Sequence, residues 1–311
     1  MEVFAEVVGS AGYLEVVPPI FEHIEVFQRL GPATDVVRKE MYAFEDKGGR
    51  TIALRPEQTA SVVRGFAEHR PAVPYKTWYA GPNFRYERAQ KGRFRQFDQV
   101  GVEVLGPYDP HLDAETITLA WRFYERLGLR RVTLLVNSLG SAEDRGRYVD
   151  ALRVHFEENR DALSEESRAT LAANPMRVLD SKREADIELV DAAPLMLDHL
   201  SDDSAEHFTA VTEALDAVGV PYTVNPRLVR GLDYYVRTTF EFAADALDAS
   251  QNAVGGGGRY DGLAAEMGAP ETPGVGFALG VDRTLLACDA EGVFAAPASA
   301  VDVFVVDATD G

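Results

Sequence analysis

The segment GPNFRYERAQKGRFRQFDQVGVE, residues 81–103, is the most informative part of the chain. It predicts a strand over Thr77–Glu87, a basic loop over Arg88–Gly92 and a returning strand. Because strand side chains alternate, Arg85 and Glu87 share one side of the first strand. In the second strand three valines face one way, and the residues facing the other way are Phe97, Gln99, Gly101 and Glu103. This mixture of an aromatic ring, an amide, a glycine and a carboxylate predicts a ligand-binding floor.

Composition bounds the class of protein. The chain has 311 residues, of which 46% are hydrophobic and 26% charged, as is typical of a soluble globular protein. The single cysteine, Cys288, excludes an internal disulfide framework and fits a reducing compartment. No apolar run approaches the ~20 residues of a membrane span, and the N-terminus lacks a signal-peptide pattern. We therefore expect a cytoplasmic protein with no membrane partner.

Charge is unevenly distributed along the chain. The net charge of −19, from 31 Lys+Arg against 50 Asp+Glu, argues against a protein that binds nucleic acid over its whole surface. Acidic pairs such as Glu157–Glu158 lie within 143–216, whereas 85–95 is rich in arginine. A local basic loop on an acidic body favours contact with RNA at one place. A solvated hairpin is the alternative interpretation.

The segment 81–103 resembles motif 2 of the class II aminoacyl-tRNA synthetases, specifically that of the histidyl-tRNA synthetase family. Six further segments are similar to the family's signatures and stand in its order: LRPEQTA (54–60), NSLGS (137–141), NPMRVLDSK (174–182), LVRGLDYYVRTTFEF (228–242), GGRYDGL (257–263) and GVGFALGVDR (274–283). One such motif is weak evidence, but six in order over nearly the whole chain are strong. The resemblance implies an α+β fold in which helices flank an antiparallel sheet, with a helical insertion.

The resemblance also divides the chain into a catalytic core, 1–295, and a short C-terminal piece, 296–311. A helix at 2–8 and the strand segment GYLEVVPPIFE resemble motif 1, which builds the dimer interface in the family, so a homodimer is expected. From about 144 to 217, apolar residues at three- and four-residue spacing predict the helical insertion, which in the family approaches the tRNA acceptor stem. The strand-like run Val301–Val306 follows an Ala/Pro linker and predicts the start of a truncated anticodon-binding domain.

A two-step ligation is the reaction that the resemblance implies. Histidine and ATP give histidyl-adenylate and pyrophosphate, and the histidyl group then passes to the 3′ end of tRNA(His). In the first step a carboxylate attacks the α-phosphorus. Because both reactants are anionic, the site must neutralise charge and hold them in line. Arginine suits this task because its planar fork clamps phosphate bidentately and keeps its proton.

Three arginines take the catalytic role by resemblance. Arg85 of motif 2 is expected at the α-phosphate and Arg283 of motif 3 at the γ-phosphate. Arg230 of LVRGLDYY is expected at the α-phosphate and the carboxylate, where other class II enzymes often place a metal ion. A surface salt bridge is the ordinary explanation for any one of them alone. All three fall inside signatures, which favours the catalytic role.

Motif 2 also implies further contacts to ATP and to tRNA. Phe97 is expected against the adenine ring, although a core aromatic is the ordinary explanation of a strand phenylalanine. Arg93 and Glu87 are expected as nucleotide contacts, and Gln90 and Lys91 as contacts to the tRNA end. The six histidines show no metal-ligand spacing, so we expect no resident metal, and Mg²⁺ to arrive with ATP.

Histidine recognition requires partners for an ammonium group and for both imidazole nitrogens. Glu103 can accept one imidazole N–H, and the Tyr235 hydroxyl can pair with the other nitrogen. An analogue without both nitrogens would leave a buried group unpaired. A strand-edge carboxylate is the alternative explanation of Glu103. By resemblance the full histidine-binding set is Glu57, Thr59, Gln99, Glu103, Tyr234, Tyr235 and Tyr260.

The glycine run Gly255–Gly258 lacks both the Lys-Ser/Thr of a P-loop and the helix-opening context of a dinucleotide fingerprint. We interpret it as backbone that gives way to a neighbouring substrate. A plain strand and turn is a nearly equal alternative.

Two functions of other classes remain open. Some bacteria use a paralogue of these synthetases, without the anticodon domain, as a regulatory subunit of ATP phosphoribosyltransferase. The short chain favours this alternative, but the complete arginine set and Glu57 count against it. A tRNA-binding module without activity is the second alternative, and it would leave Glu103 and Tyr235 unexplained.

Overall fold

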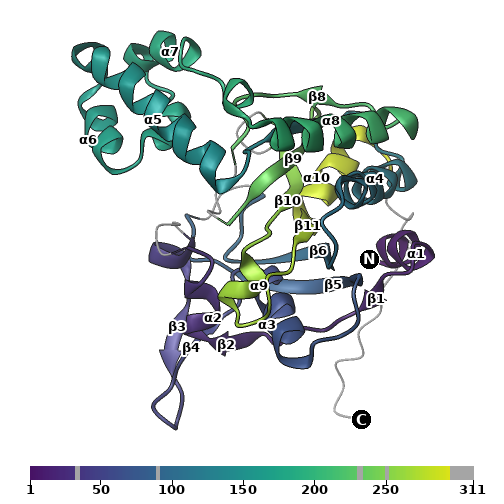
Figure 1. Ribbon diagram of the computed structural model, residues 1–311. Coiled ribbons are helices and arrows are strands. Elements are labelled where there is room, and N and C mark those ends of the chain that lie inside the picture. Colours follow the sequence, from purple (N-terminus) through teal and green to yellow (C-terminus); the bar gives the residue numbers. More distant parts are fainter. Residues whose placement is uncertain (32–35, 89–91, 230–233, 249–251, 295–311) are drawn as a thin grey trace, which may run out of the picture.

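A mainly antiparallel sheet forms the centre of the molecule (Figure 1). The computed structural model describes residues 1–31, 36–88, 92–229, 234–248 and 252–294. Within these residues the sheet has eight strands in the order β1-β5-β6-β11-β10-β9-β7-β8, and only the outer pairs β1–β5 and β7–β8 are parallel. The strands are β1 (Leu14–Glu15), β5 (Tyr75–Phe84), β6 (Gln96–Leu105), β7 (Val132–Ser138), β8 (Thr223–Val224), β9 (Val236–Ala244), β10 (Ala253–Arg259) and β11 (Gly274–Gly280).

Helices cover one face of this sheet and enclose the main core (Figure 1). They are α1 (Glu2–Ser10), α4 (Pro110–Leu127), α8 (Asp202–Ala217) and α10 (Val281–Glu291). Helix α4 begins with Asp109, whose side chain accepts a hydrogen bond from the His111 N–H, and ends at Gly128 with a φ of 86°. The three valines of β6 point into this core and are at most 2% exposed. The apolar face of the returning strand is therefore confirmed, and so is the α+β fold.

A smaller core lies on the opposite face. It is built by α2 (Ile24–Gln28), α3 (Thr59–His69) and α9 (Leu263–Glu266), together with a three-stranded sheet of β2 (Phe21–His23), β4 (Thr51–Leu54) and β3 (Ala43–Glu45). A π-helical turn spans Val36–Glu40. Helices α3 and α9 pack against each other, and their apolar side chains surround Tyr235 and Tyr260. This second core thus supports the tyrosines predicted to bind histidine.

The helical insertion extends from one end of the sheet (Figure 1). Its helices are α5 (Ala142–Glu158), α6 (Glu165–Ala173) and α7 (Glu184–Asp191), with 3₁₀ turns at Arg160–Ala162, Pro175–Asp180 and Met196–His199. It has a core of its own around Tyr148, Leu152 and Phe156. Helix α8 then returns the chain to the sheet. The linker and strand predicted for 296–311 lie outside the described residues.

The β5–β6 hairpin places its polar residues on one face. Directly opposed residues share a face, and the opposed pairs are Thr77 with Glu103, Tyr79 with Gly101, Gly81 with Gln99, and Asn83 with Phe97. The prediction that the first strand continues to Glu87 was wrong, because β5 ends at Phe84. One further backbone bond follows, from the Arg85 N–H to the Arg95 carbonyl at 2.9 Å, and the Tyr86 N–H donates to the Glu40 carbonyl at 2.7 Å.

Glycines in the sheet make room for neighbouring protein atoms. A Cβ on Gly101 would lie 2.5 Å from the Tyr79 ring, and one on Gly258 would lie 2.9 Å from the Tyr235 ring. A Cβ on Gly257 would overlap the backbone of β11. The interpretation that the glycine run gives way to a substrate was therefore wrong for Gly257 and Gly258. Protein atoms occupy that space.

We expect Gly257→Ala to lower the free energy of unfolding by about 1–3 kcal/mol, because its methyl group would overlap the Gly276 carbonyl and the Phe277 Cα of the next strand. Gly262→Ala is the matched control. No atom lies within 4 Å of a Cβ built there, and its φ of −89° suits alanine. Urea denaturation of both variants measures the difference. Equal stabilities would contradict the close packing of β10 on β11.

Candidate active site

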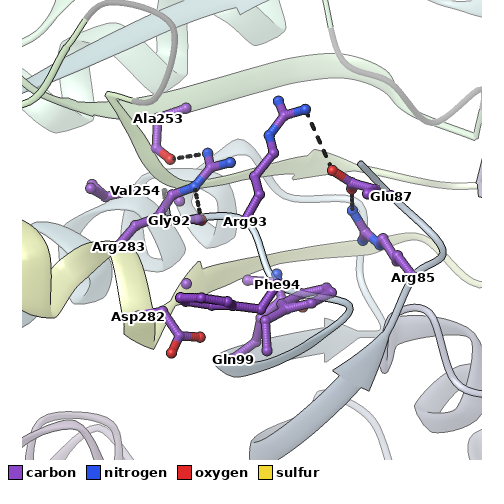
Figure 2. Close-up of a pocket in the computed structure, with 14 residues that line it drawn as sticks. Arg85, Glu87, Gly92, Arg93, Phe94, Gln99, Ala253, Val254, Asp282 and Arg283 are labelled. Carbon is purple, nitrogen blue, oxygen red and sulfur yellow. Dashed lines mark hydrogen bonds and ion pairs between the residues drawn. The ribbon is translucent and has the colours of Figure 1, made fainter. Parts of the chain in front are cut away.

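A cavity of about 270 Å³ opens where β6 and β10 begin and β11 ends (Figure 2). Every residue predicted to bind ATP lines it, and Gln99 joins them from the histidine set. The lining residues are Arg85, Glu87, Gly92, Arg93, Phe94, Phe97, Gln99, Ala253, Val254, Gly255, Ala278, Gly280, Asp282 and Arg283. The structure thus gathers residues that lie far apart in the sequence into one concave site.

Backbone carbonyls hold two of the arginines at the cavity. Arg283 donates from Nε to the Gly92 carbonyl at 3.0 Å and from Nη1 to the Ala253 carbonyl at 2.8 Å (Figure 2). Arg85 donates from Nε to the Pro56 carbonyl at 2.9 Å. A carbonyl orients a guanidinium without cancelling its charge. Burial lowers the pKa of Arg283, and the neighbouring Arg93 guanidinium lowers it further, so an anion bound here would relieve both effects.

Glu87 lies between two of the arginines. Its carboxylate is 3.4 Å from Arg93 Nη1 and 4.0 Å from Arg85 Nη1 (Figure 2). The Arg85 guanidinium also lies over the Phe97 ring, 5.2 Å from its centroid. Arg85 and Glu87 therefore share a side, as strand alternation predicts, although both lie beyond the strand.

Among the residues of the cavity wall that sequence reasoning did not assign are Asp282 and Phe94. Asp282 Oδ2 accepts a hydrogen bond from the Asp98 N–H at 3.1 Å, which ties the start of α10 to β6. Phe94 lines the cavity from the loop before β6 and is 50% exposed. The position of Asp282 beside Arg283 in the GVDR segment was the available signal. For Phe94 the sequence offered no signal beyond its place next to the basic loop.

Glu103 is the centre of a buried polar cluster next to the cavity. Its side chain points from β6 to the same face as Gln99, and the residue is 1% exposed. Oε1 accepts hydrogen bonds from Thr59 Oγ1 at 2.6 Å and Tyr79 Oη at 3.1 Å, and Oε2 accepts one from Tyr260 Oη. Burial raises the pKa of Glu103 to about 8, and the nearby Glu57 charge also raises it. The hydrogen bonds from the three hydroxyl groups lower the pKa but do not outweigh burial.

Glu57 lies where α3 begins. Its two carboxylate oxygens accept the Thr59 N–H at 2.9 Å and the Ala60 N–H at 2.8 Å, which satisfies free donors at the helix start. The residue is 4% exposed, and burial raises its pKa although these N–H groups and the Arg85 charge act in the opposite direction. Two buried carboxylates in one cluster are costly unless a cation joins them.

Tyrosine rings enclose this cluster. The rings of Tyr234 and Tyr235 lie 4.6 Å apart between centroids, and those of Tyr234 and Tyr260 lie 5.7 Å apart, edge to face. Burial raises the pKa of Tyr234, and the charges of Glu57 and Glu103 contribute to that shift. Tyr260 therefore contacts Glu103, Tyr234 lies within the field of both carboxylates, and Tyr235 packs against Tyr234.

The sequence analysis missed Tyr79 and Asn83 of β5. Tyr79 donates to Glu103, and Asn83 Nδ2 donates to Gln99 Oε1 at 2.7 Å. Extending the alternation of β6 to its hairpin partner would have found both, because opposed residues share a face. Of the predicted site residues, Arg230, Gln90 and Lys91 lie outside the described residues.

Two further features concern metals and membranes. In the part of the chain that the structure describes, no group of three or more His, Cys, Asp or Glu side chains is arranged to hold a metal ion. No helix of that part has the length and apolar character needed to span a bilayer.

The chemistry of the two adjoining groups is complementary. Arginines around an open cavity suit a polyphosphate, whereas buried carboxylates among tyrosines suit a small cationic ligand. The family model described as "Histidyl-tRNA synthetase" matches residues 1–284. The chain belongs to the histidyl-tRNA synthetase family. The predicted family and enzyme class are therefore confirmed.

Similar proteins agree with this membership in the histidyl-tRNA synthetase family. A "Histidine--tRNA ligase" of Geobacillus kaustophilus is 51% identical over 301 residues, which cover 95% of this chain and 71% of that protein. One of Thermus thermophilus is 48% identical over 311 residues, covering 98% and 74%. The crystal structure of apo histidyl-tRNA synthetase from S. aureus matches with a TM-score of 0.76 and 37% identity, covering 94% of this chain and 70% of that one.

A structure from Bacillus halodurans described as an "ATP phosphoribosyltransferase regulatory subunit/histidyl-tRNA synthetase" also matches, with a TM-score of 0.67. It is 23% identical and covers 92% of this chain and 77% of that one. At this identity the likeness shows a shared fold and nothing more. It therefore gives the regulatory alternative no support against relatives near 50% identity.

The buried cluster makes stability depend on pH. Burial raises the pKa of Glu103 from 4.5 to about 8, so the native chain keeps a proton that the unfolded chain has lost. The contribution of this group to stability is full below pH 4.5 and disappears as pH rises through about 8. We expect the stability of the wild type relative to Glu103→Gln to fall over that interval.

Urea denaturation at a series of pH values measures this effect. Glu68→Gln is the control, because the Glu68 side chain is 58% exposed and pairs with Arg64 on the surface of α3. Its pH profile should follow that of the wild type. A Glu103→Gln profile parallel to the wild type would show that Glu103 titrates normally.

Proposed function

We propose that this chain is the catalytic core of a histidine–tRNA ligase, which activates histidine with ATP and then transfers it to tRNA(His). One observation carries the proposal. Arginines held by carbonyls surround a cavity that adjoins two buried carboxylates, so a polyphosphate and a cationic amino acid can bind side by side. The relatives named histidine–tRNA ligases, at about half identity over nearly the whole chain, support it.

In the first step an oxygen of the histidine carboxylate attacks the α-phosphorus, and the bond to pyrophosphate breaks. Arg85 suits the α-phosphate because its anchor on Pro56 places it next to Glu57, between the two ligand groups. Arg283, held on the far wall, takes the γ-phosphate. ATP brings Mg²⁺, which offsets phosphate charge that the arginines leave.

The remaining cavity residues bind the nucleotide. The adenine ring takes its place against Phe97, beside the Arg85 guanidinium, whose central carbon is 5.2 Å from the centroid of the Phe97 ring. Arg93 contacts the phosphates, and Glu87 orients Arg93 and Arg85 through its carboxylate. The position of each side chain on the cavity wall supports its role.

Histidine occupies the buried cluster. Glu57, Thr59 and Gln99 take the α-ammonium, which offsets the cost of burying the Glu57 charge. A carboxylate offers about four acceptor positions. Thr59, Tyr79 and Tyr260 use three positions of Glu103, so one remains for an imidazole N–H. Tyr235 pairs with the other imidazole nitrogen, and the rings of Tyr234 and Tyr260 enclose the ligand.

In the second step a ribose hydroxyl at the tRNA 3′ end attacks the carbonyl carbon of the adenylate, and AMP leaves. Gln90 and Lys91 contact the tRNA end and Arg230 contacts the α-phosphate and carboxylate, all by resemblance, since they lie outside the described residues. An enzyme of this family acts where tRNA is used in translation, which supports a cytoplasmic location.

Histidine-dependent ATP–pyrophosphate exchange tests the proposed function. We expect robust exchange with histidine and none with other amino acids. Arg283→Ala should raise the KM for ATP at least about tenfold, because it removes a charged contact to phosphate. Its Kd for histidine, measured by calorimetry, should not change. Arg153→Ala is the control, since that side chain is 54% exposed and pairs with Asp150 on α5.

A folded wild-type chain that binds histidine but catalyses no exchange would contradict the proposal. That result would favour the regulatory alternative, and the next experiment would be to test whether the chain binds ATP phosphoribosyltransferase in a pull-down.

A homodimer that forms through motif 1 is part of the proposal. Four large apolar side chains near β1 and β2 are exposed: Leu14 by 70%, Val17 by 80%, Ile20 by 46% and Phe21 by 56%. Strand β1 is also an edge strand of the main sheet. A concentrated apolar surface at a sheet edge favours burial against a second copy.

We expect Val17→Glu to raise the dimer dissociation constant at least tenfold, because it would bury a charge in the interface. Sedimentation velocity over a concentration series measures this constant. Val154→Glu is the control, since Val154 is 58% exposed on α5, away from motif 1. A wild-type chain that sediments as a monomer throughout would exclude the dimer.

A further inference from the structure

The two ends of the helical arm, defined as residues 142–200, are joined to each other at its base. Asp144 is fully buried and accepts hydrogen bonds from the Ser141 N–H at 2.8 Å and the Ser201 N–H at 3.0 Å. Ser204 Oγ donates to the same carboxylate at 2.5 Å. Asp144 thereby joins the point where the chain enters the arm to the point where it leaves. These hydrogen bonds of Asp144 do not by themselves connect the arm to the site.

Arg227 makes a second attachment, from the sheet side to the far part of the arm. It donates from Nη1 to the Pro194 carbonyl at 2.9 Å and from Nη2 to the Asp191 and Ala193 carbonyls at 3.1 and 2.5 Å. These carbonyls stand at and just after the end of α7, where arginine commonly satisfies free acceptors. Three bonds from one fork fix both its place and its orientation.

The segment that carries Arg227 continues toward the histidine-binding tyrosines. Arg227 N–H donates to Asn225 Oδ1 at 3.1 Å, and the Leu228 carbonyl accepts from Asn137 Nδ2 of β7 at 3.0 Å. Asn137 is 1% exposed. Segment 225–229 is therefore held by the sheet on one side and, through Arg227, by the arm on the other.

Val229 lies between two hydrophobic cores. It packs against the core of the arm, which contains Tyr148 and Met196, and also against the site core, which contains Tyr235 and Tyr260. Closely packed interiors transmit displacements instead of absorbing them. A shift of the arm would therefore move Val229 against the core that contains Tyr235 and Tyr260.

We propose that Arg227 is a positioning residue, which holds the helical arm in register with the histidine pocket through segment 225–229. This inference rests on the proposed function and adds a residue that contacts neither substrate. It also predicts which substrate is affected. The described residues of the ATP cavity come from β6, β10, β11, α10 and the loops beside them, and none comes from segment 225–229, so the KM for histidine should change more than the KM for ATP.

The test compares Arg227→Gln with the wild type in ATP–pyrophosphate exchange. We expect the KM for histidine to rise about tenfold, because hydrogen bonds that set the pocket's geometry are lost, and the KM for ATP to stay within about twofold. Calorimetry should show a parallel rise in the Kd for histidine. Arg227→Lys, which keeps the charge and can reach a carbonyl, should recover part of the loss.

Arg160→Gln is the matched control on the arm, since Arg160 is 49% exposed and pairs only within the arm, with Glu157. It should behave as the wild type. A merely structural role for Arg227 would lower the melting temperature and the active fraction without separating the two KM values, and that result overturns the inference. If Arg227→Gln does not fold, Arg227→Lys and Val229→Ala are measured instead, and an unchanged histidine KM in both overturns it.

Failure of the proposed function would look different. If the wild type catalyses no exchange, the proposed ligase function is wrong. The role of Arg227 is then still decided by comparing the Kd for histidine of Arg227→Gln with that of the wild type. If the wild type catalyses exchange and Arg227→Gln has the same KM values and the same Kd for histidine, only the positioning role is wrong.

Discussion

The burial of one carboxylate, Glu103, constrains the whole site. A charge or a proton held at 1% exposure in the middle of a sheet must be matched by donors that do not move. Thr59, Tyr79 and Tyr260 provide them from three different elements, so α3, β5 and the chain after β10 converge on one atom group. Space is the second requirement. A Cβ on Gly276 would overlap the Glu103 carboxylate, so β11 needs glycine opposite it.

A feature of the fold or of the site could be predicted where the sequence pattern that marks it lies within a single element. Alternation along β6 predicts that Gln99 and Glu103 share a face, because a strand's period of two needs no partner. Tyr79 requires the register of β5 against β6, which follows from the hairpin's pairing and not from either strand alone. The strand end at Phe84 was missed because it depends on where the backbone pairing with β6 stops, and the alternation of side chains, which continues to Glu87, does not show that point.

The same distinction explains why the arm's attachment escaped the sequence analysis. Spacing of apolar residues predicts the helices of the arm, since each helix has its own periodicity. Arg227 binds carbonyls, and a carbonyl is present at every residue, so no pattern in the sequence marks its partner. No sequence pattern marks Val229 either, because its role depends on two hydrophobic cores that both pack against it. Links between units are therefore the part that only coordinates reveal.

Arg283 at this site and Arg259 of the core are held by different partners, and the difference has a function. Arg259 is 1% exposed and is paired with the carboxylates of Asp113 and Asp261. Burial lowers its pKa, but the Asp113 and Asp261 carboxylates together raise it by more, and they offset the guanidinium charge. Such a pair joins α4 to β10 and leaves nothing for a ligand.

Arg283 is held by carbonyls of Gly92 and Ala253, which orient the guanidinium while its charge remains available. Because the chain carries a net charge of −19, a polyphosphate approaches an unfavourable field unless the positive charges at the cavity stay uncancelled. Anchoring on carbonyls solves that problem, since it fixes geometry before the anion arrives. The field of an acidic protein can thus reverse sign locally without any excess of basic residues.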